Sequence, residues 1–293
     1  MAQQADWDTV GANTCIAAQI FPPKHGYLEN TIASIRAAFD RGADVVEFDI
    51  TATVDRQFAV FHDRVLECRT DGHGPTREHT LQELKALDIG YKYTSDGGRT
   101  YPFRGKGRGL MPSIAEVFEA FPDRAFLVDI KGNVPRDGAL LATYLSRLSP
   151  AQRSRLIVFG RDGALAQLRD RLTDVRTFSV GSIANCLVRY IAYGWTGVVP
   201  AACDRAALFV PINIAPWLWG WPNLFMDRLK ARGGSIVVVG PFAGGNFSTG
   251  VDTQEDLSRL PAGYDGGIWT NDLELVTAAL KSTNGRKQDS SLR

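Results

Sequence analysis

Short apolar runs rich in β-branched residues recur along the chain and alternate with segments of helical periodicity. The runs that we interpret as strands cover 14–18, 45–50, 58–62, 126–131, 155–159, 175–180, 196–200, 235–240 and 267–270, and a further run over 208–214 competes for one place. Helices are expected over 30–41, 80–87, 113–121, 137–147, 162–170, 222–232 and 271–281. Nearly continuous apolar strands indicate a parallel sheet buried on both faces. The alternation predicts an α/β fold, and about eight strands favour a (β/α)8 TIM barrel.

Two segments interrupt this alternation. Only residues 51–57 separate two of the strand runs, too few for a parallel crossover, so we expect a hairpin-like turn or a barrel irregularity there. The stretch 88–112 is rich in Gly and Tyr and is interpreted as a long inserted loop over one end of the barrel. No internal repeat or domain boundary is visible. We therefore expect one barrel domain over 1–293, with a polar tail after about residue 281.

Ionisable residues stand at i and i+2 in two of the apolar runs. Glu47 and Asp49 lie in V-V-E-F-D-I, and Asp129 and Lys131 lie in F-L-V-D-I-K. Residues two apart share a face of a strand, so each pair is expected to point the same way. Three carboxylates and an amine are costly to bury unless they bind a charged partner. A divalent cation, Mg²⁺ or Ca²⁺, and a phosphate satisfy all four groups, whereas an ordinary surface salt bridge is the alternative for each residue alone.

A histidine accompanies these residues at the end of another run. His62 can hold a proton near neutral pH and act as a general acid or base. In barrel enzymes the reactive groups lie at the carboxyl ends of the strands, where His62 and the four residues above are all expected.

Composition excludes several classes of protein. The chain is 44% hydrophobic and 22% charged, as in an ordinary globular protein, and its net charge of +1 does not favour nucleic-acid binding. No apolar run is long enough to span a membrane, and the first residues do not form a signal peptide. We expect a cytoplasmic protein, with a periplasmic or secreted location open if a leader was removed. The cysteines form no C-x-x-C pair and are expected to be reduced and mostly buried; they are Cys15, Cys68, Cys186 and Cys203.

Several motifs, taken in order, carry a family resemblance over most of the chain. They are L-E-N-T (28–31), the segments 41–55, 60–74 and 80–90, M-P-S-I-A-E-V-F-E-A-F-P (111–122), V-D-I-K (128–131) and G-G-I-W-T-N (266–271). Together they resemble the glycerophosphodiester phosphodiesterase family. The resemblance implies a barrel of the phospholipase C-like phosphodiesterase type that acts on a glycerophosphodiester-like or sugar-containing phosphodiester.

The resemblance also implies roles for single residues. Glu47 and Asp49 match metal ligands, Asp129 replaces the usual third ligand Glu and is one methylene shorter, and Lys131 matches the lysine beside the phosphate. His62 matches one of the two catalytic histidines of the family.

The second catalytic histidine is missing from its usual place. The family carries it in H-R-G at the end of the first strand, where this chain has Ala18 and Gln19. Alanine can neither transfer a proton nor bond to phosphate. Three explanations stay open: a deliberately inactivated variant, which we favour, a natural pseudoenzyme, or replacement by His25 from the following loop. Gln19 can still donate hydrogen bonds to a phosphate.

Aromatic residues of the second half are candidates for the pocket. Trp269 ends a late strand and is expected to face the site. The stretch 216–225 is interpreted as core or pocket wall in preference to a membrane surface; its large aromatic residues are Trp217, Trp219, Trp221 and Phe225.

The expected activity is metal-dependent hydrolysis of a phosphodiester to a phosphomonoester and an alcohol, by histidine acid–base catalysis. The chain itself is expected to turn over slowly because of Ala18. The alternatives are a non-catalytic phosphodiester-binding protein and a lipid-directed phospholipase D-like enzyme. The expected partner is a small-molecule phosphodiester, without nucleic acid or stable membrane insertion, and the oligomeric state is open.

Overall fold

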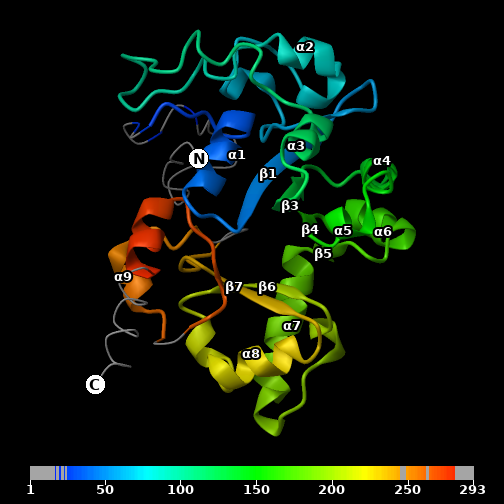
Figure 1. The fold of residues 1–293 in the computed structure, drawn as a ribbon, viewed down its shortest axis with the longest axis vertical. Helices are drawn as coiled ribbons and strands as arrows, with labels where there is room; N and C mark the ends of the chain where they lie inside the picture. The colour runs from blue at the N-terminus through cyan, green and yellow to red at the C-terminus, as the bar shows by residue number, and fades with distance from the viewer. Residues whose placement is uncertain are drawn as a thin grey trace. The chain divides into compact units, whose positions relative to one another are not determined.

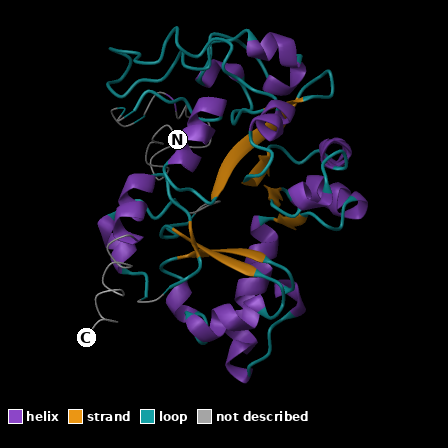
Figure 2. Cartoon of the chain, in the orientation of Figure 1, coloured by secondary structure: helices purple, strands orange, loops and turns teal. Residues whose placement is uncertain are grey.

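The computed structural model describes residues 17, 20, 23, 25–244, 249–261 and 264–280. The chain divides into two compact units, Met1–Val175 and Arg176–Arg293, which are described separately. Figures 1 and 2 show their helices and strands. The expected tail after residue 281 and most of the expected strand 14–18 lie outside the described residues.

Unit 1 is built on a sheet with the strand order β2-β1-β3-β4. These strands are β1 (Val45–Ala52), β2 (Phe58–Ala59), β3 (Ala125–Ile130) and β4 (Leu156–Gly160). Strand β3 pairs in parallel with both β1 and β4. Strand β2 pairs antiparallel with β1, with Thr51 opposite Ala59, so the expected hairpin is confirmed. Arg56 in this turn adopts a left-handed backbone conformation with φ 59°.

The helices of unit 1 lie where their periodicity predicted them, except the short helix α5, which was not predicted. They are α1 (Ile32–Asp40), α2 (Leu81–Lys85), α3 (Ile114–Ala120), α4 (Pro135–Leu145), α5 (Pro150–Arg153) and α6 (Asp162–Arg171), with 3-10 turns η3 (Leu66–Cys68) and η4 (Thr76–Glu78). Capping boxes, in which Thr or Ser and a residue three positions later satisfy each other's backbone N–H groups, begin α1, α2, α3 and α5. Gly138 permits the close approach of α4 to α6, because a Cβ there would lie 1.8 Å from the carbonyl oxygen of Ala164.

The inserted segment 88–112 is a long loop without helices or strands, as predicted. Its centre is the buried carboxylate of Asp88, which is 1% exposed. The carboxylate accepts hydrogen bonds from the backbone N–H groups of Gly90, Gly105 and Gly107 at 2.5–3.0 Å. One aspartate therefore holds both ends of the insertion together.

Unit 2 contains a parallel sheet with the order β6-β7-β8. These strands are β6 (Ala207–Pro211), β7 (Ser235–Val239) and β8 (Gly267–Ile268), and unit 2 also includes the strand β5 (Arg176–Phe178), which is not part of this sheet. Its helices are α7 (Val180–Tyr193), α8 (Asn223–Lys230) and α9 (Gln254–Ser258), with 3-10 turns η5 (Gly194–Thr196), η6 (Ala201–Cys203) and η7 (Ala215–Trp217). Residues 273–280 are also helical. No helix among the described residues is long and apolar enough to cross a bilayer.

The sequence interpretation of unit 2 was wrong in two places. The run 196–200 forms no strand, and the competing run supplies β6 instead. Helix α7 was not predicted, although its buried residues Ile183, Cys186, Leu187 and Tyr190 recur at helical spacing. Ser179 begins this helix by accepting a hydrogen bond from the backbone N–H of Ser182.

The aromatic stretch 216–225 is only partly core. Phe225 is 1% exposed and Trp221 is half-buried, as expected for core or pocket wall. Trp217 and Trp219, in contrast, are 74% and 48% exposed, so the interpretation was wrong for these two residues.

The expectation of reduced cysteines was also wrong. A disulfide joins Cys186 on α7 to Cys203 in η6, with Cα atoms 4.9 Å apart. Cys68 in unit 1 is disulfide-bonded as well. Pairing of this kind follows from how α7 packs, and a sequence separation of 17 residues does not reveal it.

Candidate metal and phosphate site

The site of unit 1 is created by the register of β1 and β3. Parallel pairing places Asp49 directly opposite Asp129, and Glu47 precedes Asp49 by two residues on the same face of β1. The alternate residues Val46, Phe48 and Ile50 are fully buried, so the two faces of β1 differ in character.

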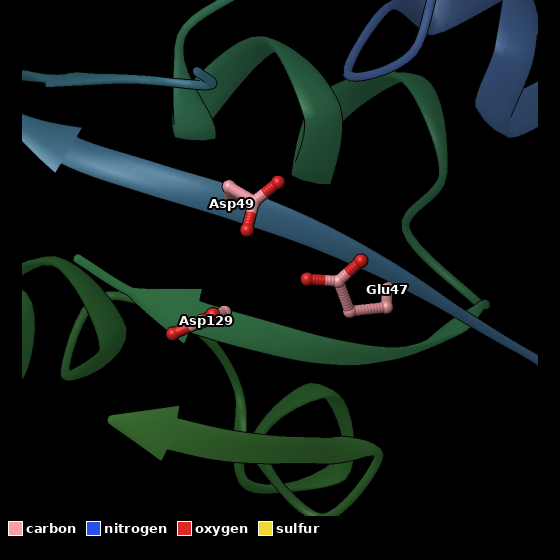
Figure 3. Close-up of side chains that lie close together, drawn as sticks. All are labelled: Glu47, Asp49 and Asp129. Carbon is pink, nitrogen blue, oxygen red and sulfur yellow. The ribbon is translucent and has the colours of Figure 1, made fainter. Parts of the chain in front are cut away.

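The three carboxylates lie close enough to share an ion. One oxygen each from Glu47, Asp49 and Asp129 lies within 4.8 Å of the other two (Figure 3). Carboxylate oxygens are the ligands that Mg²⁺ and Ca²⁺ prefer. The sequence pattern predicted this juxtaposition of the three residues.

Lys131 lies between two of these carboxylates. Its Nζ is 2.7 Å from Asp49 Oδ1 and donates to Asp129 Oδ2 at 2.6 Å. Its backbone N–H continues the sheet by donating to Ile50 O at 2.9 Å. The lysine side chain is 21% exposed, so a ligand can reach the ammonium without displacing the strand.

Asn30 orients Asp49 from the turn before α1. Its side-chain amide donates to Asp49 Oδ2 at 2.8 Å, and its Oδ1 accepts the backbone N–H of Asp49 at 3.0 Å. Asn30 has a left-handed backbone with φ 57°, a conformation in which asparagine is enriched. The L-E-N-T segment therefore belongs to the support of the site.

The charges of the cluster shift its pKa values in opposite directions. Burial raises the pKa of Glu47 well above its ordinary value, and the Asp49 charge adds to this effect. Burial would also raise the pKa of Asp49, but the Lys131 ammonium outweighs it and lowers the pKa to about 2. Burial raises the pKa of Asp129 against the opposing charge of Lys131. One ammonium does not compensate three largely buried carboxylates, so a further cation would stabilise the cluster.

His62 is held by a buried network that the sequence did not predict. Its Nδ1 is 2.7 Å from Asp63 Oδ1, and Asp63 Oδ2 accepts from Arg69 Nε at 2.7 Å. Arg69 also donates to Tyr93 OH at 2.8 Å and pairs with Glu29. Tyr93 OH in turn donates to Glu29 at 2.8 Å. The only sequence signal for this network was the Asp next to the histidine in F-H-D.

The network lies within electrostatic reach of the carboxylates. His62 contributes to the lowered pKa of Asp49. The bond to Asp63 fixes the imidazole ring and favours a proton on Nδ1. Arg69 is 2% exposed, so the orientation of the ring depends on a buried guanidinium.

The geometry of this cluster does not test the roles predicted for Ala18, Gln19, His25 and Trp269. Ala18 and Gln19 lie outside the described residues. The Nδ1 of His25 accepts the backbone N–H of Tyr27 at 3.3 Å, a local contact in its loop. Trp269 belongs to unit 2, where its ring meets Phe209 edge-on with centroids 5.6 Å apart. The site roles of these residues stay predictions.

Comparisons with known proteins agree with the resemblance read from the motifs. Residues 21–142 match the model of the glycerophosphoryl diester phosphodiesterase family. The chain is 38% identical over 103 residues to a glycerophosphodiester phosphodiesterase of Caldanaerobacter subterraneus subsp. tengcongensis, a match that covers 35% of this chain and 39% of the relative. It is 31% identical over 137 residues to the human protein named lysophospholipase D GDPD1, covering 45% of this chain and 40% of the relative. The matches thus span about two fifths of the length of these relatives.

Solved structures resemble a larger part of the chain. The glycerophosphoryl diester phosphodiesterase domain of Rv2277c from Mycobacterium tuberculosis aligns with a TM-score of 0.59 and 17% identity, over 88% of this chain and 94% of that one. An Oleispira antarctica phosphodiesterase in complex with sn-glycerol-3-phosphate aligns with a TM-score of 0.58 and 18% identity, over 86% of this chain and 91% of that one. The predicted fold class, an α/β barrel of the type found in these proteins, is confirmed.

Proposed function

We propose that this chain, whose residues 21–142 carry the sequence of the glycerophosphoryl diester phosphodiesterase family, is a metal-dependent phosphodiesterase. It hydrolyses a glycerophosphodiester-like substrate to a phosphomonoester and an alcohol. The observation that carries the proposal is the convergence of Glu47, Asp49 and Asp129 on one point, beside Lys131.

The donor set fits a hard divalent cation. The three residues offer only oxygen atoms, and burial, with the Asp49 charge added to it, raises the pKa of Glu47 in spite of Lys131. Glu47, Asp49 and Asp129 would hold Mg²⁺ or Ca²⁺, which when bound supplies Lewis-acid polarisation of the phosphoryl group.

Lys131 binds the phosphate in this proposal. Its ammonium already contacts Asp49 and Asp129, and the three carboxylates raise its pKa above the ordinary value despite burial. A permanently charged ammonium at this place can pair with a phosphate oxygen and stabilise the negative charge that develops on it.

His62 transfers the proton. Asp63 and Arg69 hold its ring, so that the nitrogen that transfers the proton has a fixed orientation. Either the attacking hydroxyl loses a proton to this nitrogen or the departing alkoxide receives one from it. A general acid or base of this kind typically contributes about 10²–10⁴-fold to the rate.

Alanine at position 18 lacks the imidazole that would act together with His62, so this chain is impaired in hydrolysis. On the same scale, Ala18→His should raise the rate of hydrolysis by about 10²–10⁴-fold. His25 competes as the second acid–base group. If Ala18→His changes nothing while His25→Ala abolishes activity, His25 takes the role and Ala18 is irrelevant.

A panel of glycerol-, sugar- and lysolipid phosphodiesters tests the function. The chain and its Ala18→His variant are incubated with Mg²⁺ or Ca²⁺, or with a chelator, and the phosphomonoester is quantified. We expect metal-dependent release that is faster with the variant. Binding of a diester without release by either protein, in the presence of both metals, would instead identify a non-catalytic binding protein.

A lipid-directed enzyme is the second candidate, and the exposed rings of Trp217 and Trp219 favour it. A human relative over 137 residues is named lysophospholipase D. This candidate predicts faster release from a lysolipid phosphodiester above its critical micelle concentration than below it. The glycerol diester, which forms no micelles, is the control.

The disulfides favour an oxidising compartment over the cytoplasm that the sequence suggested. Cys186–Cys203 and the bonded Cys68 are typical of proteins folded in the periplasm or outside the cell. Thiol labelling of the denatured, unreduced protein from its native source tests this proposal. Absence of labelling at these three cysteines supports it, and full labelling contradicts it.

A further inference from the structure

Strand β4 lies beside the site and shares the face of the sheet that bears the carboxylates. It pairs in parallel with β3, on the side of β3 away from β1 (Figure 3). The register places Phe159 opposite Asp129 and Gly160 opposite Ile130. Gly160 and Ile130 are buried, whereas Phe159 and Asp129 are half-buried. Phe159 and Asp129 therefore belong to one face, and the buried pair belongs to the other.

Arg161 continues the alternation of β4 beyond the last residue of the strand. Its backbone is extended, with φ −89° and ψ 151°. Two residues after Phe159, it lies on the face of Phe159 and Asp129 and in the same row as Lys131, which follows Asp129 by two residues on β3. Neighbouring strands are about 4.8 Å apart. The backbone therefore places two cationic residues side by side at the carboxyl edge of the sheet.

A hydrogen bond fixes the two connections that carry these cations to each other. Asn133, two residues after Lys131, accepts the backbone N–H of Gly163, two residues after Arg161, through its Oδ1 at 2.9 Å. A Cβ on Gly163 would lie 2.7 Å from that oxygen, so this approach favours glycine. The backbone of Arg161 is thus held beside Lys131 without the help of its own side chain.

The two cations differ in what their side chains contact. The Lys131 ammonium is shared between Asp49 and Asp129, at 2.7 and 2.6 Å. The Arg161 side chain is exposed and forms no hydrogen bond or ion pair with any residue that the structure describes, the adjacent Asp162 included. One exposed arginine is ordinary. This one, however, stands at the carboxyl end of a strand, where barrel enzymes bind their substrates.

We propose that Arg161 binds the phosphoryl group of the substrate, and of its phosphomonoester product, beside Lys131. This inference rests on the proposed function and adds a residue to it. Two carboxylates already share the charge of Lys131, so this ammonium alone offers a phosphate little net attraction. Arg161 adds an unshared charge, and the planar fork of a guanidinium matches two oxygens of a phosphate.

Calorimetric titration with sn-glycerol 3-phosphate tests the proposal without hydrolysis. The whole chain is titrated with this phosphomonoester in the presence of Ca²⁺ and in its absence. Arg161→Gln should weaken binding by about tenfold or more, as expected for the loss of a charge-assisted contact. Arg161→Lys keeps the charge but not the fork, so it should weaken binding less. The affinity of Arg161→Gln for Ca²⁺ alone should stay within about twofold of wild type, because Arg161 contacts no carboxylate of the cluster.

Arg155→Gln is the matched control, because Arg155 directly precedes β4 at the opposite end of the strand and pairs with Asp123 at 3.2 Å. It removes the same charge from unit 1 and should leave phosphomonoester binding unchanged. The proposal is overturned if Arg161→Gln binds as well as wild type or if Arg155→Gln weakens binding equally. Absence of phosphomonoester binding by the wild-type chain, with or without Ca²⁺, also overturns it. Hydrolysis of diesters by a chain in which Arg161→Gln binds normally would leave the proposed function intact and remove only Arg161 from it.

Discussion

Both units contain a parallel sheet, but the two sheets differ in what their strands carry. In unit 1, β1 and β3 combine one buried apolar face with another that bears Glu47, Asp49 and Asp129. In unit 2, β6 and β7 read A-L-F-V-P and S-I-V-V-V and carry no charge. The family match over residues 21–142 falls entirely within unit 1. The strands of unit 1 therefore bring charged side chains together, whereas β6 and β7 contribute no charge.

The surfaces of the two units show the reverse contrast. Unit 1 buries its charged network around Arg69, whereas unit 2 exposes the side chains of Trp195 and Trp217. A buried charged network constrains the sequence, because each charge needs its partner, while exposed apolar side chains constrain it less. This difference explains why the recognisable motifs lie mainly in the first half of the chain.

The strongest test of the contrast is the removal of a buried positive charge. Lys131→Met leaves Asp49 and Asp129 without their ammonium, and we expect a loss of about 3–5 kcal/mol in the free energy of unfolding. Urea unfolding in the presence of a chelator measures the loss, and Ca²⁺ or Mg²⁺ should restore part of it. Lys230→Met is the matched control, since Lys230 and Asp265 form an exposed pair at 3.2 Å in unit 2. It should change stability by less than about 1 kcal/mol. Equal effects of the two substitutions would remove the distinction between the units.

The Cys186–Cys203 disulfide stabilises unit 2 by a covalent link, whereas the exposed Lys230–Asp265 pair contributes little. Replacing both Cys186 and Cys203 by alanine should lower the free energy of unfolding by about 3 kcal/mol, because a loop of this length is no longer closed in the unfolded chain. Hydrolysis per folded molecule should stay unchanged, since the catalytic residues lie in unit 1. An unaltered urea midpoint would show that the disulfide does not stabilise the fold.

A smaller effect is expected from the orientation of His62. Asp63→Asn should lower kcat by about 10–100-fold in the Ala18→His background, the range typical of groups that orient a functional histidine. KM should stay nearly constant, because Asp63 contacts the histidine ring. Asp71→Asn, which breaks a pair with Arg108 at 2.7 Å on the insertion, is the control. If Asp63→Asn changed KM and left kcat unaltered, Asp63 would have a purely structural role.

The smallest effect concerns the insertion and depends on pH. The hydroxyl and the backbone N–H of Thr100 donate to Asp96 and lower its pKa to about 2. The unfolded chain has the ordinary pKa of about 4, so the bonds stabilise the loop above that pH. This contribution is lost as the pH falls towards 2. Asp96→Asn should therefore be less stable than wild type at pH 6, and the difference should narrow at pH 3. A constant difference would mean that the carboxylate charge is irrelevant.

The sequence predicted the site better than the surroundings of the site. Alternation along a strand places Glu47 and Asp49 on one face whatever the tertiary structure, so this pair was predictable from spacing alone. The short connection 51–57 likewise required an antiparallel turn. These predictions depend on local geometry, which the sequence specifies directly.

Features that depend on tertiary packing were missed. Arg69 and Tyr93 reach His62 only through the folding of the insertion, and no spacing rule connects them. The disulfide between Cys186 on α7 and Cys203 also depends on how the helix packs, and sequence separation does not reveal it. The exposure of Trp217 contradicted the expectation that aromatic residues cluster in a core.

Calorimetric titration with Ca²⁺ and Mg²⁺ tests the central claim most directly, since the account requires one cation among three carboxylates. We predict one bound cation per chain, with an affinity at least about tenfold weaker for Asp49→Asn and Asp129→Asn, because each variant loses a charged ligand. Asp265→Asn in unit 2 should bind as wild type does. Absence of binding in the wild-type chain, or equal affinity in all four proteins, would contradict the metal site and the hydrolase built on it.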